Sequence, residues 1–397
     1  MSSGVLSREF EGYIGQSSMI RAMFETGIKL KKEHGEDKVC DFSLGNPDLP
    51  PPREVKQAML ELAEEADKPF AFGYMPNAGF PWLLEMMADE YSREQGTKIS
   101  AGDILLTGGA AGAINCLFRA VLERGDEVIG MRPYFVDYIN YAANFGGVFK
   151  PVDTSADFSL NLAAIEAAIT AQTRVVLINS PHNPTGQIYS KEELEGLVAI
   201  LRKKSAEHGR PIFLASDEPY RFLTFDGAVV PAVLPMYEYA IVLGSFAKNM
   251  SLPGERLGYL IASPNMPDKA SFMGGVVMAS RILGFLNAPV VGQKILKHAL
   301  GKGVDLEIYA RRRQMLGQIL SDAGYEFTMP RGAFYFFPKA PGGDDLAFNQ
   351  ILAKQLILGV PGTGFGMPGY FRLAFCVDEK VIARSADGFK RAIDSVK

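Results

Sequence analysis

The sequence predicts an α/β protein whose large domain contains a doubly wound, mostly parallel seven-stranded sheet. From residue 103 onward, short apolar runs alternate regularly with stretches of helical periodicity, which is typical of such sheets. After about residue 290 longer helical stretches and fewer strands replace this alternation, which indicates a second, smaller α+β domain. With 397 residues, 47% hydrophobic and 22% charged, the chain is long enough for two globular domains.

The first hundred residues predict three helices and one short strand. Apolar residues at helical spacing predict a helix over 18–34, which Gly35 ends. A strand at 39–44 follows and runs into a turn. Two further helices, at 53–66 and 81–95, are expected on either side of an aromatic loop at 72–79.

Seven strands and four helices are expected in the alternating part of the chain. The strands are at 104–107, 127–131, 148–152, 174–180, 212–216, 240–245 and 257–262, and the helices are at 110–123, 134–145, 162–170 and 191–208. Ligands in open α/β sheets bind outside the carboxyl ends of the strands. Residues directly after these strands are therefore the candidates for chemistry.

The last hundred residues predict a different arrangement. A helical stretch to about residue 322 is followed by a strand at 333–337, a helix at 346–358, a strand at 371–377 and a closing helix at 379–396. We assign the N-terminal segment to the same lobe, because a chain that enters and leaves a large sheet commonly builds a second lobe from both ends. The expected boundaries are 1–48 and 290–397 for the small domain and 49–289 for the large, cofactor-binding domain.

Composition argues against several other classes of protein. The net charge of −4 gives no electrostatic reason to expect nucleic acid or a membrane surface as a partner. Cys40, Cys116, Cys376 and the four scattered histidines form no metal-binding pattern, so we expect no metal and a reduced, cytoplasmic setting. The N-terminus has no apolar signal core. The apolar segment 272–292 contains Arg281, and we expect it to be buried or at an interface rather than in a membrane.

Residues 245–259 carry the most informative pattern. Lys248 lies just past the strand at 240–245, on a loop broken by proline and glycine. A lysine in a partly desolvated pocket can lose its proton and act as an amine nucleophile toward an aldehyde. Ser245 and Arg256, on either side, are phosphate-type ligands. This combination suggests a phosphorylated aldehyde cofactor, for which pyridoxal phosphate is the obvious candidate. The alternative interpretation of Lys248 is a solvated lysine on the surface.

Two other strand ends offer groups suited to a phosphorylated ring. The small residues Gly109, Ala110 and Ala111 open a helix, where backbone N–H groups can approach a phosphate. Tight helix–sheet packing is the alternative, and the segment is neither a GxGxxG fingerprint nor a P-loop. Phe135, after the strand at 127–131, could stack on a flat ring or simply pack in the core.

Two further strand ends supply polar groups. Asn183, held out of the helical region by the proline that follows it, can aim its amide at a ring hydroxyl or merely form a polar turn. Asp217 ends the strand at 212–216, where an unpaired buried carboxylate is costly. It therefore needs a cation such as a protonated pyridine nitrogen, unless it only caps a helix. Tyr220, three residues later, could reach the ring hydroxyl.

These motifs together resemble the class I/II (fold-type I) pyridoxal-phosphate aminotransferases, and in particular the prokaryotic aspartate aminotransferases. The match runs from Gly45 to Arg372 in the family's order, and this joint order is far more specific than any single motif. The motifs, in chain order, are a GxxxA phosphate loop, PxF, NPTG, SDxxY, SxxK, GxRxG and RLAF.

The resemblance implies a role for each candidate residue. Lys248 bonds to the aldehyde of pyridoxal 5′-phosphate and later shuttles a proton, while Asp217 pairs with the pyridine nitrogen. It further implies that Asn183 and Tyr220 contact the ring hydroxyl and that Phe135 stacks on the ring. The phosphate contacts that it implies are Gly109, Ala110, Ala111, Ser245, Arg256 and, from the neighbouring subunit of a homodimer, Tyr74. The substrate α-carboxylate is expected to bind Arg372, together with Asn183 and the Gly45 backbone. Many relatives have Ser or Thr where this chain has Ala110 and Ala111. Phosphate binding should therefore rely more on Ser245 and Arg256.

The implied activity is ping-pong transamination between an amino acid and a 2-oxo acid such as 2-oxoglutarate. Aspartate is the first choice of amino donor, and aromatic amino acids or alanine come next. The alternative reactions are those of a β-lyase or a cyclopropane-carboxylate-type synthase of the same fold, which would also keep Lys248 and Asp217. Arg281 precedes Asn287 by six residues, whereas aspartate-specific relatives of one branch use a spacing of five. We therefore expect a structural or surface role for Arg281. A nucleotide-dependent oxidoreductase would need a true GxGxxG, which the sequence lacks.

Overall fold

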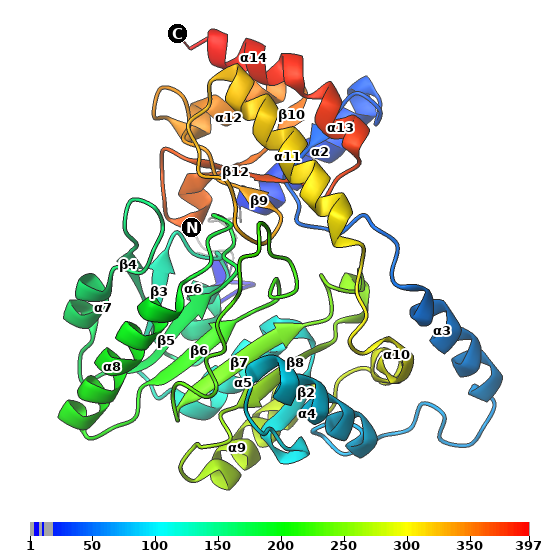
Figure 1. Ribbon diagram of the computed structural model, residues 1–397, viewed down its shortest axis with the longest axis vertical. Coiled ribbons are helices and arrows are strands. Elements are labelled where there is room, and N and C mark those ends of the chain that lie inside the picture. The colour runs from blue at the N-terminus through cyan, green and yellow to red at the C-terminus, as the bar shows by residue number, and fades with distance from the viewer. Residues whose placement is uncertain (1–3, 8–9, 12–18, 397) are drawn as a thin grey trace. The chain divides into compact units, whose positions relative to one another are not determined.

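The computed structural model describes residues 4–7, 10–11 and 19–396 (Figure 1). Two compact units make up this part of the chain. The larger unit comprises Asn46–Glu307 and Pro330–Ala333. The smaller unit comprises the described residues up to Gly45, Ile308–Met329 and the chain from Phe334 onward. The functional domain boundaries expected at residues 48 and 289 stay a prediction.

A seven-stranded sheet forms the centre of the larger unit, as the sequence predicted. Its strands are β2 (Ile104–Thr107), β3 (Glu127–Arg132), β4 (Val148–Asp153), β5 (Thr173–Asn179), β6 (Phe213–Asp217), β7 (Ala240–Ser245) and β8 (Gly258–Ala262). The strand order is β2-β8-β7-β6-β5-β3-β4. Strand β8 runs antiparallel to both of its neighbours, β2 and β7, and the other strand pairs of this sheet are parallel. The predicted fold class is therefore confirmed.

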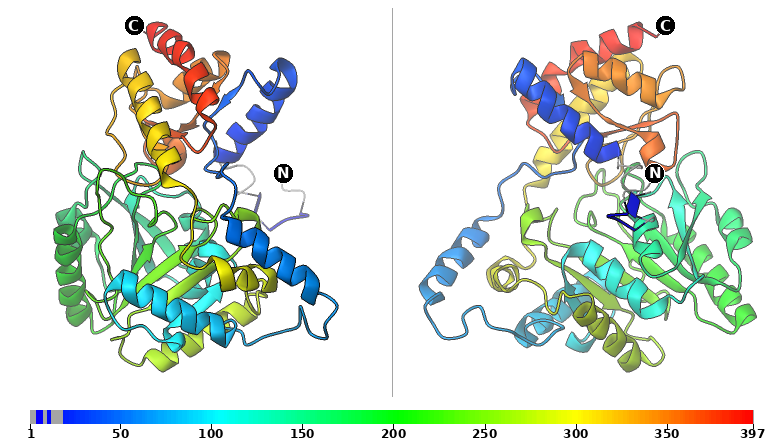
Figure 2. Two further views of the ribbon diagram at one scale, coloured as in Figure 1. Left: turned by 45° about the vertical axis from the view of Figure 1, so that its right-hand side comes forward. Right: turned by 180° about the vertical axis from the view of Figure 1, so that it is seen from behind.

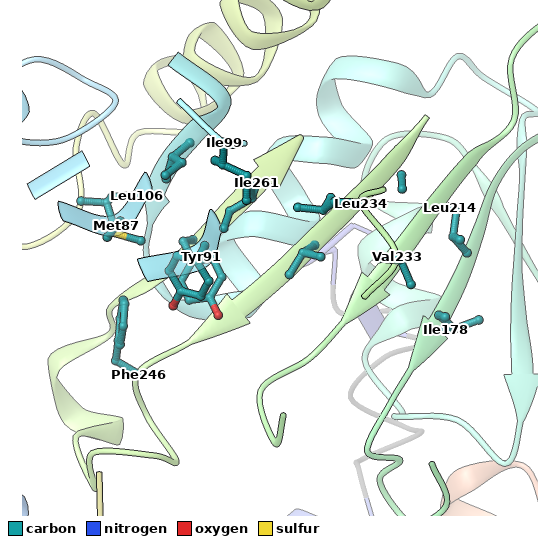
Figure 3. Close-up of a cluster of buried hydrophobic side chains, with 14 of the residues drawn as sticks. Met87, Tyr91, Ile99, Leu106, Ile178, Leu214, Val233, Leu234, Phe246 and Ile261 are labelled. Carbon is teal, nitrogen blue, oxygen red and sulfur yellow. The ribbon is translucent and has the colours of Figure 1, made fainter. Parts of the chain in front are cut away.

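Two hydrophobic cores cover the two faces of this sheet, because alternate strand residues point to opposite sides. Leu214 and Val242 belong to the core that Figure 3 shows in part, together with Met87 and Tyr91. Helices α3 (Arg53–Glu65), α4 (Pro81–Gln95), α7 (Leu162–Ala168), α8 (Lys191–His208) and α10 (Val290–Ala299) contribute to it. The other core is covered by α5 (Gly109–Val121), α6 (Tyr138–Ala143) and α9 (Lys269–Ile282). The remaining short helices of this unit are η1 (Ala101–Asp103) and η2 (Pro253–Glu255).

Helices α3 and α10 lie side by side although they are far apart in the sequence (Figure 2). They bury Ala58 and Leu62 from α3 and Leu296 from α10. A 2.7 Å contact between Glu61 Oε2 and His298 Nε2 joins the same two helices. This packing holds α3 against α10.

The smaller unit contains elements from both ends of the chain. They are α2 (Met19–His34), β1 (Cys40–Asp41), α11 (Leu306–Ala323), β9 (Tyr335–Phe336), α12 (Asp345–Lys354), β10 (Ile357–Leu358), β11 (Val360–Pro361), η3 (Gly362–Phe365), β12 (Phe371–Ala374), α13 (Glu379–Arg384) and α14 (Ala386–Asp394). Strands β1 and β10 pair in parallel, and β11, β12 and β9 form an antiparallel sheet. The smaller unit and its β1–β10 sheet are thus built from segments more than 300 residues apart.

Several predicted elements differ in extent from the observed ones. The long helix expected up to residue 322 is two helices, α10 and α11, because Gly301 adopts a left-handed conformation (φ 74°) between them. The predicted strand at 39–44 is reduced to β1, and the predicted helix at 134–145 is reduced to α6. The predicted helix at 346–358 ends at Lys354 and continues as β10, whereas β11 was not expected.

The apolar segment at 272–292 is not continuous helix. It contains the end of α9, a loop and the start of α10. One face of α9 is buried through Met273, Val276 and Ala279, while Met278 and Ile282 are exposed. Within the described part of the chain, no helix is both long and apolar enough to cross a membrane.

Candidate active site

A pocket of about 250 Å³ lies at the carboxyl ends of the parallel strands of the large sheet. Asn179, Asp217 and Ser245, the last residues of β5, β6 and β7, all line it. The sheet brings them together because these strands are parallel neighbours. The predicted site residues among its lining are Ala110, Ala111, Phe135, Asn183, Asp217, Tyr220, Ser245, Lys248 and Arg256.

Lys248 is held in a turn directly after β7. Phe246 on one side and Met250 on the other are almost completely buried, and they anchor the turn in the core. The Ala247 N–H donates to Ser245 Oγ at 3.1 Å, which tightens the same turn. Lys248, partly buried, therefore lines the pocket from a fixed backbone.

Asp217 is buried beside the pocket, with 6% of its surface exposed. Its Oδ2 accepts a hydrogen bond from the Tyr138 hydroxyl at 2.5 Å, while Oδ1 has no hydrogen-bond partner among the residues that the structure describes. Burial raises the pKa of Asp217 from 3.8 to about 7, the Tyr138 hydrogen bond lowers it, and the nearby Glu218 charge raises it. A carboxylate in this position would be stabilised by a cation in the pocket.

Sequence reasoning did not identify Tyr138. The residue lies three positions after Phe135, at the start of α6, and this short spacing was the sequence feature that could have indicated a shared site. The two rings meet edge to face at 5.5 Å and 76°. Tyr141, which also lines the pocket, was missed as well.

Asn179 connects two of the strand ends. Its side-chain amide donates to the backbone carbonyl of Asp217 at 2.7 Å, and its Oδ1 accepts the N–H of Asn183 at the same distance. The loop with Asn183 is thereby fixed to the end of β6. His182, in this loop, is fully buried and contacts Thr185 Oγ1 at 2.8 Å. Burial lowers the pKa of His182 to about 3, so its ring is neutral near pH 7.

The start of α5 and Arg256 form a part of the pocket suited to an anion. Gly109 has φ of 78°, and a Cβ atom added there would lie 2.8 Å from Arg256 Nη2. Gly258 is equally required, because its added Cβ would lie 2.4 Å from the carbonyl carbon of Gly109. The first N–H groups of a helix have no intrahelical acceptor. Together with the guanidinium they can bind a phosphate.

The turn that carries Tyr220 is fixed by a charge cluster that we did not predict, in which Glu218 is buried and Glu94 is exposed. Arg221 Nε lies 2.9 Å from Glu94 Oε1 on α4, and its Nη1 lies 3.0 Å from Glu218 Oε2. The hydroxyl of Ser216 donates to the other oxygen of Glu218 at 2.7 Å. These bonds hold the backbone between Asp217 and Tyr220 in one conformation.

Arg372 and Gly45 belong to the smaller unit. Arg372 is 2% exposed, its Nη2 donates to the Ser43 carbonyl at 2.7 Å, and its guanidinium lies 4.6 Å from the Tyr335 ring centroid and 4.9 Å from that of Phe365. A Cβ atom at Gly45 would lie 2.1 Å from the Tyr335 hydroxyl. A glycine is therefore required there, next to the ring that supports Arg372.

Two residues considered in the sequence lie away from the pocket. Tyr74 is 90% exposed in the loop before α4. Arg281 is exposed in the last turn of α9 and is not part of the pocket lining. Across the described ranges, no group of three His, Cys, Asp or Glu side chains is placed to hold a metal ion.

The pocket combines an amine, a buried carboxylate, an aromatic ring and a positively charged site that can bind an anion. Lys248 supplies the amine, Asp217 the carboxylate, Phe135 the ring, and Arg256 with the start of α5 the anion site. This set matches a flat, phosphorylated ring that carries a positive charge and a reactive carbonyl.

Comparison with known proteins gives a consistent result. The family model "Aminotransferase class I and II" matches residues 37–389. A probable aspartate/prephenate aminotransferase from Aquifex aeolicus is 31% identical over 374 residues, which cover 90% of this chain and 92% of the relative. The crystal structure of an amino transferase from Eubacterium rectale has a TM-score of 0.95 and 36% identity, and covers 99% of both chains. Aspartate aminotransferase from Thermus thermophilus with maleate has a TM-score of 0.86 and 27% identity, and covers 99% of this chain and all of its own.

Proposed function

Since the chain belongs to the class I and II aminotransferases, we propose that it uses pyridoxal 5′-phosphate to transfer an amino group from aspartate to a 2-oxo acid such as 2-oxoglutarate. The single observation that carries this proposal is the position of Lys248 in one pocket with Asp217, whose Oδ1 finds no hydrogen-bond donor in the described chain. A buried carboxylate oxygen of this kind suits a cationic ring nitrogen.

The residues of the pocket fit the cofactor group by group. We assign its phosphate to the backbone N–H groups of Gly109, Ala110 and Ala111, to Ser245 and to Arg256. Helix α5 is 13 residues long, so the positive end of its dipole adds to the guanidinium charge. Because alanine offers no hydroxyl, the side-chain part of phosphate binding falls to Ser245 and Arg256.

The ring is assigned to a second group of side chains. Phe135 would contact its face, and the Asn183 amide and the Tyr220 hydroxyl would donate to its oxygen. Asp217, when ionised, stabilises a protonated ring nitrogen. When bound, the cofactor supplies the carbonyl group that accepts the amino group and a ring that withdraws electrons.

Lys248 is the group that we assign to proton transfer. Its amine would take the proton from the substrate Cα and return it to the acceptor carbon, as a general base and then a general acid. The turn anchored by Phe246 and Met250 keeps the amine in place. Arg372, with Asn183 and the backbone of Gly45, is assigned to the substrate α-carboxylate through a bidentate pair.

Aspartate is proposed as the donor on the strength of the relatives. The Aquifex aeolicus protein is a probable aspartate/prephenate aminotransferase, and the Thermus thermophilus structure contains maleate, a dicarboxylate. Aromatic amino acids or alanine are the alternative donors. A β-lyase of the same fold is the alternative reaction.

We also propose a homodimer in which Tyr74 reaches the phosphate of the neighbouring subunit. The observation that supports it is the exposure of Tyr74, Phe70 and Phe72, at 90%, 93% and 52%, in the loop before α4. Sedimentation at assay concentration tests it, because a fully active monomer would contradict the proposal. The cytoplasmic location stays a prediction from the cysteine usage.

The deciding experiment is a panel of amino acids mixed with the cofactor-loaded protein and followed by the absorbance of the bound cofactor. Loss of the band with aspartate and glutamate, and its return with 2-oxoglutarate, is the expected result. A response to aromatic or small apolar donors alone would overturn the choice of aspartate. Release of ammonia, with the band restored without added 2-oxoglutarate, would indicate a lyase. The absence of a band with added pyridoxal phosphate would refute the whole proposal.

A further inference from the structure

The two oxygens of the Asp217 carboxylate have different surroundings. Oδ2 accepts the Tyr138 hydroxyl at 2.5 Å, inside the protein. Oδ1 is equally buried, yet the described ranges provide it with no hydrogen-bond donor. A single neutral donor therefore determines which oxygen remains available to a ligand.

The fold holds the Tyr138 hydroxyl in place with little freedom. Tyr138 is 3% exposed, and its N–H donates to the Phe135 carbonyl at 3.2 Å. Its ring meets Phe135 edge to face and lies 6.4 Å from the ring of Phe149. Because the ring is fixed by these contacts, the hydrogen bond to Asp217 loses little side-chain entropy on formation.

Several polar and charged groups lie around the Asp217 carboxylate. Tyr138 and Glu218 act on its pKa directly. The other polar or charged groups near it are those that line the same pocket, namely Tyr141 from α6, Tyr220 after β6, Asn179 from β5, and Lys248 and Arg256. Burial and the Glu218 charge both favour the protonated form of Asp217, whereas the Tyr138 hydrogen bond favours the ionised form. The Tyr138 hydrogen bond thus counteracts the effects of burial and of the Glu218 charge on the pKa of Asp217.

We propose that Tyr138 is a positioning residue, which orients the Asp217 carboxylate so that Oδ1 is presented to a cationic ring nitrogen and keeps that carboxylate ionised. This inference rests on the proposed function, because the ring nitrogen is that of the proposed cofactor. Tyr138 itself acts through Asp217 and is not assigned a contact with the ring.

The test compares two ligands that differ in a single ring atom. Binding of pyridoxal phosphate and of its analogue with CH in place of the ring nitrogen is measured on the cofactor-free full chain. The proteins are the wild type, Tyr138→Phe, Asp217→Asn, the double variant that combines these two changes, and Tyr134→Phe. Tyr134→Phe is the matched control, because it removes a hydroxyl from the same segment near Phe149. Thermal unfolding confirms that each variant is folded.

Tyr138→Phe should weaken pyridoxal phosphate about 10-fold or more and leave the analogue within about 2-fold of the wild type. In an Asp217→Asn background the same change should have no further effect on the preference for pyridoxal phosphate, because the ionised carboxylate through which Tyr138 acts on the ring nitrogen is absent. Equal weakening of both ligands, or no weakening of either, would overturn the proposal.

A second measurement does not depend on the cofactor. Isotope-edited infrared titration of the cofactor-free protein, with Asp217→Asn as the reference, reports the pKa of the Asp217 carboxyl directly. Tyr138→Phe should raise this pKa, whereas Tyr134→Phe should not, and an unchanged pKa in Tyr138→Phe would overturn the inference. If no protein binds pyridoxal phosphate, the proposed function fails, while this titration still decides whether Tyr138 controls Asp217.

Discussion

Replacement of Asp217 by asparagine should remove a pH-dependent loss of stability from the cofactor-free protein. Burial raises the pKa of Asp217 from 3.8 to about 7 in the native state, while the unfolded chain keeps the ordinary value. Below about pH 3 both states hold the proton, so this carboxyl costs no stability. As the pH rises from about 4 to 7, the unfolded state ionises while the native state stays protonated, so the free energy of unfolding falls until the pH passes the native pKa.

The size of this effect follows from the two pKa values. The difference between 3.8 and about 7 corresponds to about 4 kcal/mol once the pH is above both values. About 3 kcal/mol of this should appear between pH 5 and pH 8. Asparagine keeps the shape of the side chain and an oxygen that can accept the Tyr138 hydroxyl, but it does not ionise.

The assay is urea unfolding of the cofactor-free wild type and Asp217→Asn at pH 5 and pH 8. The stability of the wild type relative to the variant should fall by about 3 kcal/mol between the two pH values. Saturation of the wild type with pyridoxal phosphate should abolish this fall, because a cationic ring nitrogen favours the ionised carboxylate. Parallel pH profiles of the two cofactor-free proteins, within about 1 kcal/mol, would refute the reasoning.

Three further predictions concern the lysine, the phosphate site and the charge cluster. Lys248→Ala should lower the transamination rate by about 10²–10⁴-fold in single-turnover assays, and a rate near that of the wild type would exclude its role in proton transfer. Arg256→Ala should weaken pyridoxal phosphate about 10–100-fold, but not pyridoxal, which lacks the phosphate; equal losses would point to a general disturbance. Arg221→Met leaves the buried Glu218 without its cationic partner, so the free energy of unfolding in urea should fall by about 3–5 kcal/mol. Arg202→Met, at an exposed pair with Glu238, is the control, and its free energy of unfolding should fall by less than about 1 kcal/mol.

Sequence periodicity determined the layout of the larger unit. Buried strands read as continuous apolar runs and helices as amphipathic stretches, so β2 and β7 and the helices α4 and α8 have the predicted limits. Since parallel strands align their carboxyl ends, the residues after β5, β6 and β7 could be expected in one place. The structure gathers Asn183, Asp217 and Lys248 in one pocket for this reason.

Tertiary packing alone decided the features that depend on contacts between distant segments. No local pattern indicates that β8 runs antiparallel between β2 and β7, because its pairing with β2 joins residues as far apart as Ile104 and Ile261. The sequence contains Tyr138 and Asp217 79 residues apart, and only the folded chain brings the hydroxyl within 2.5 Å of one carboxylate oxygen. Arg221 likewise finds Glu94 only through the packing of α4. The sequence thus determined which chemical groups the site contains, whereas the geometry that sets their charge and orientation arises from long-range contacts in the core.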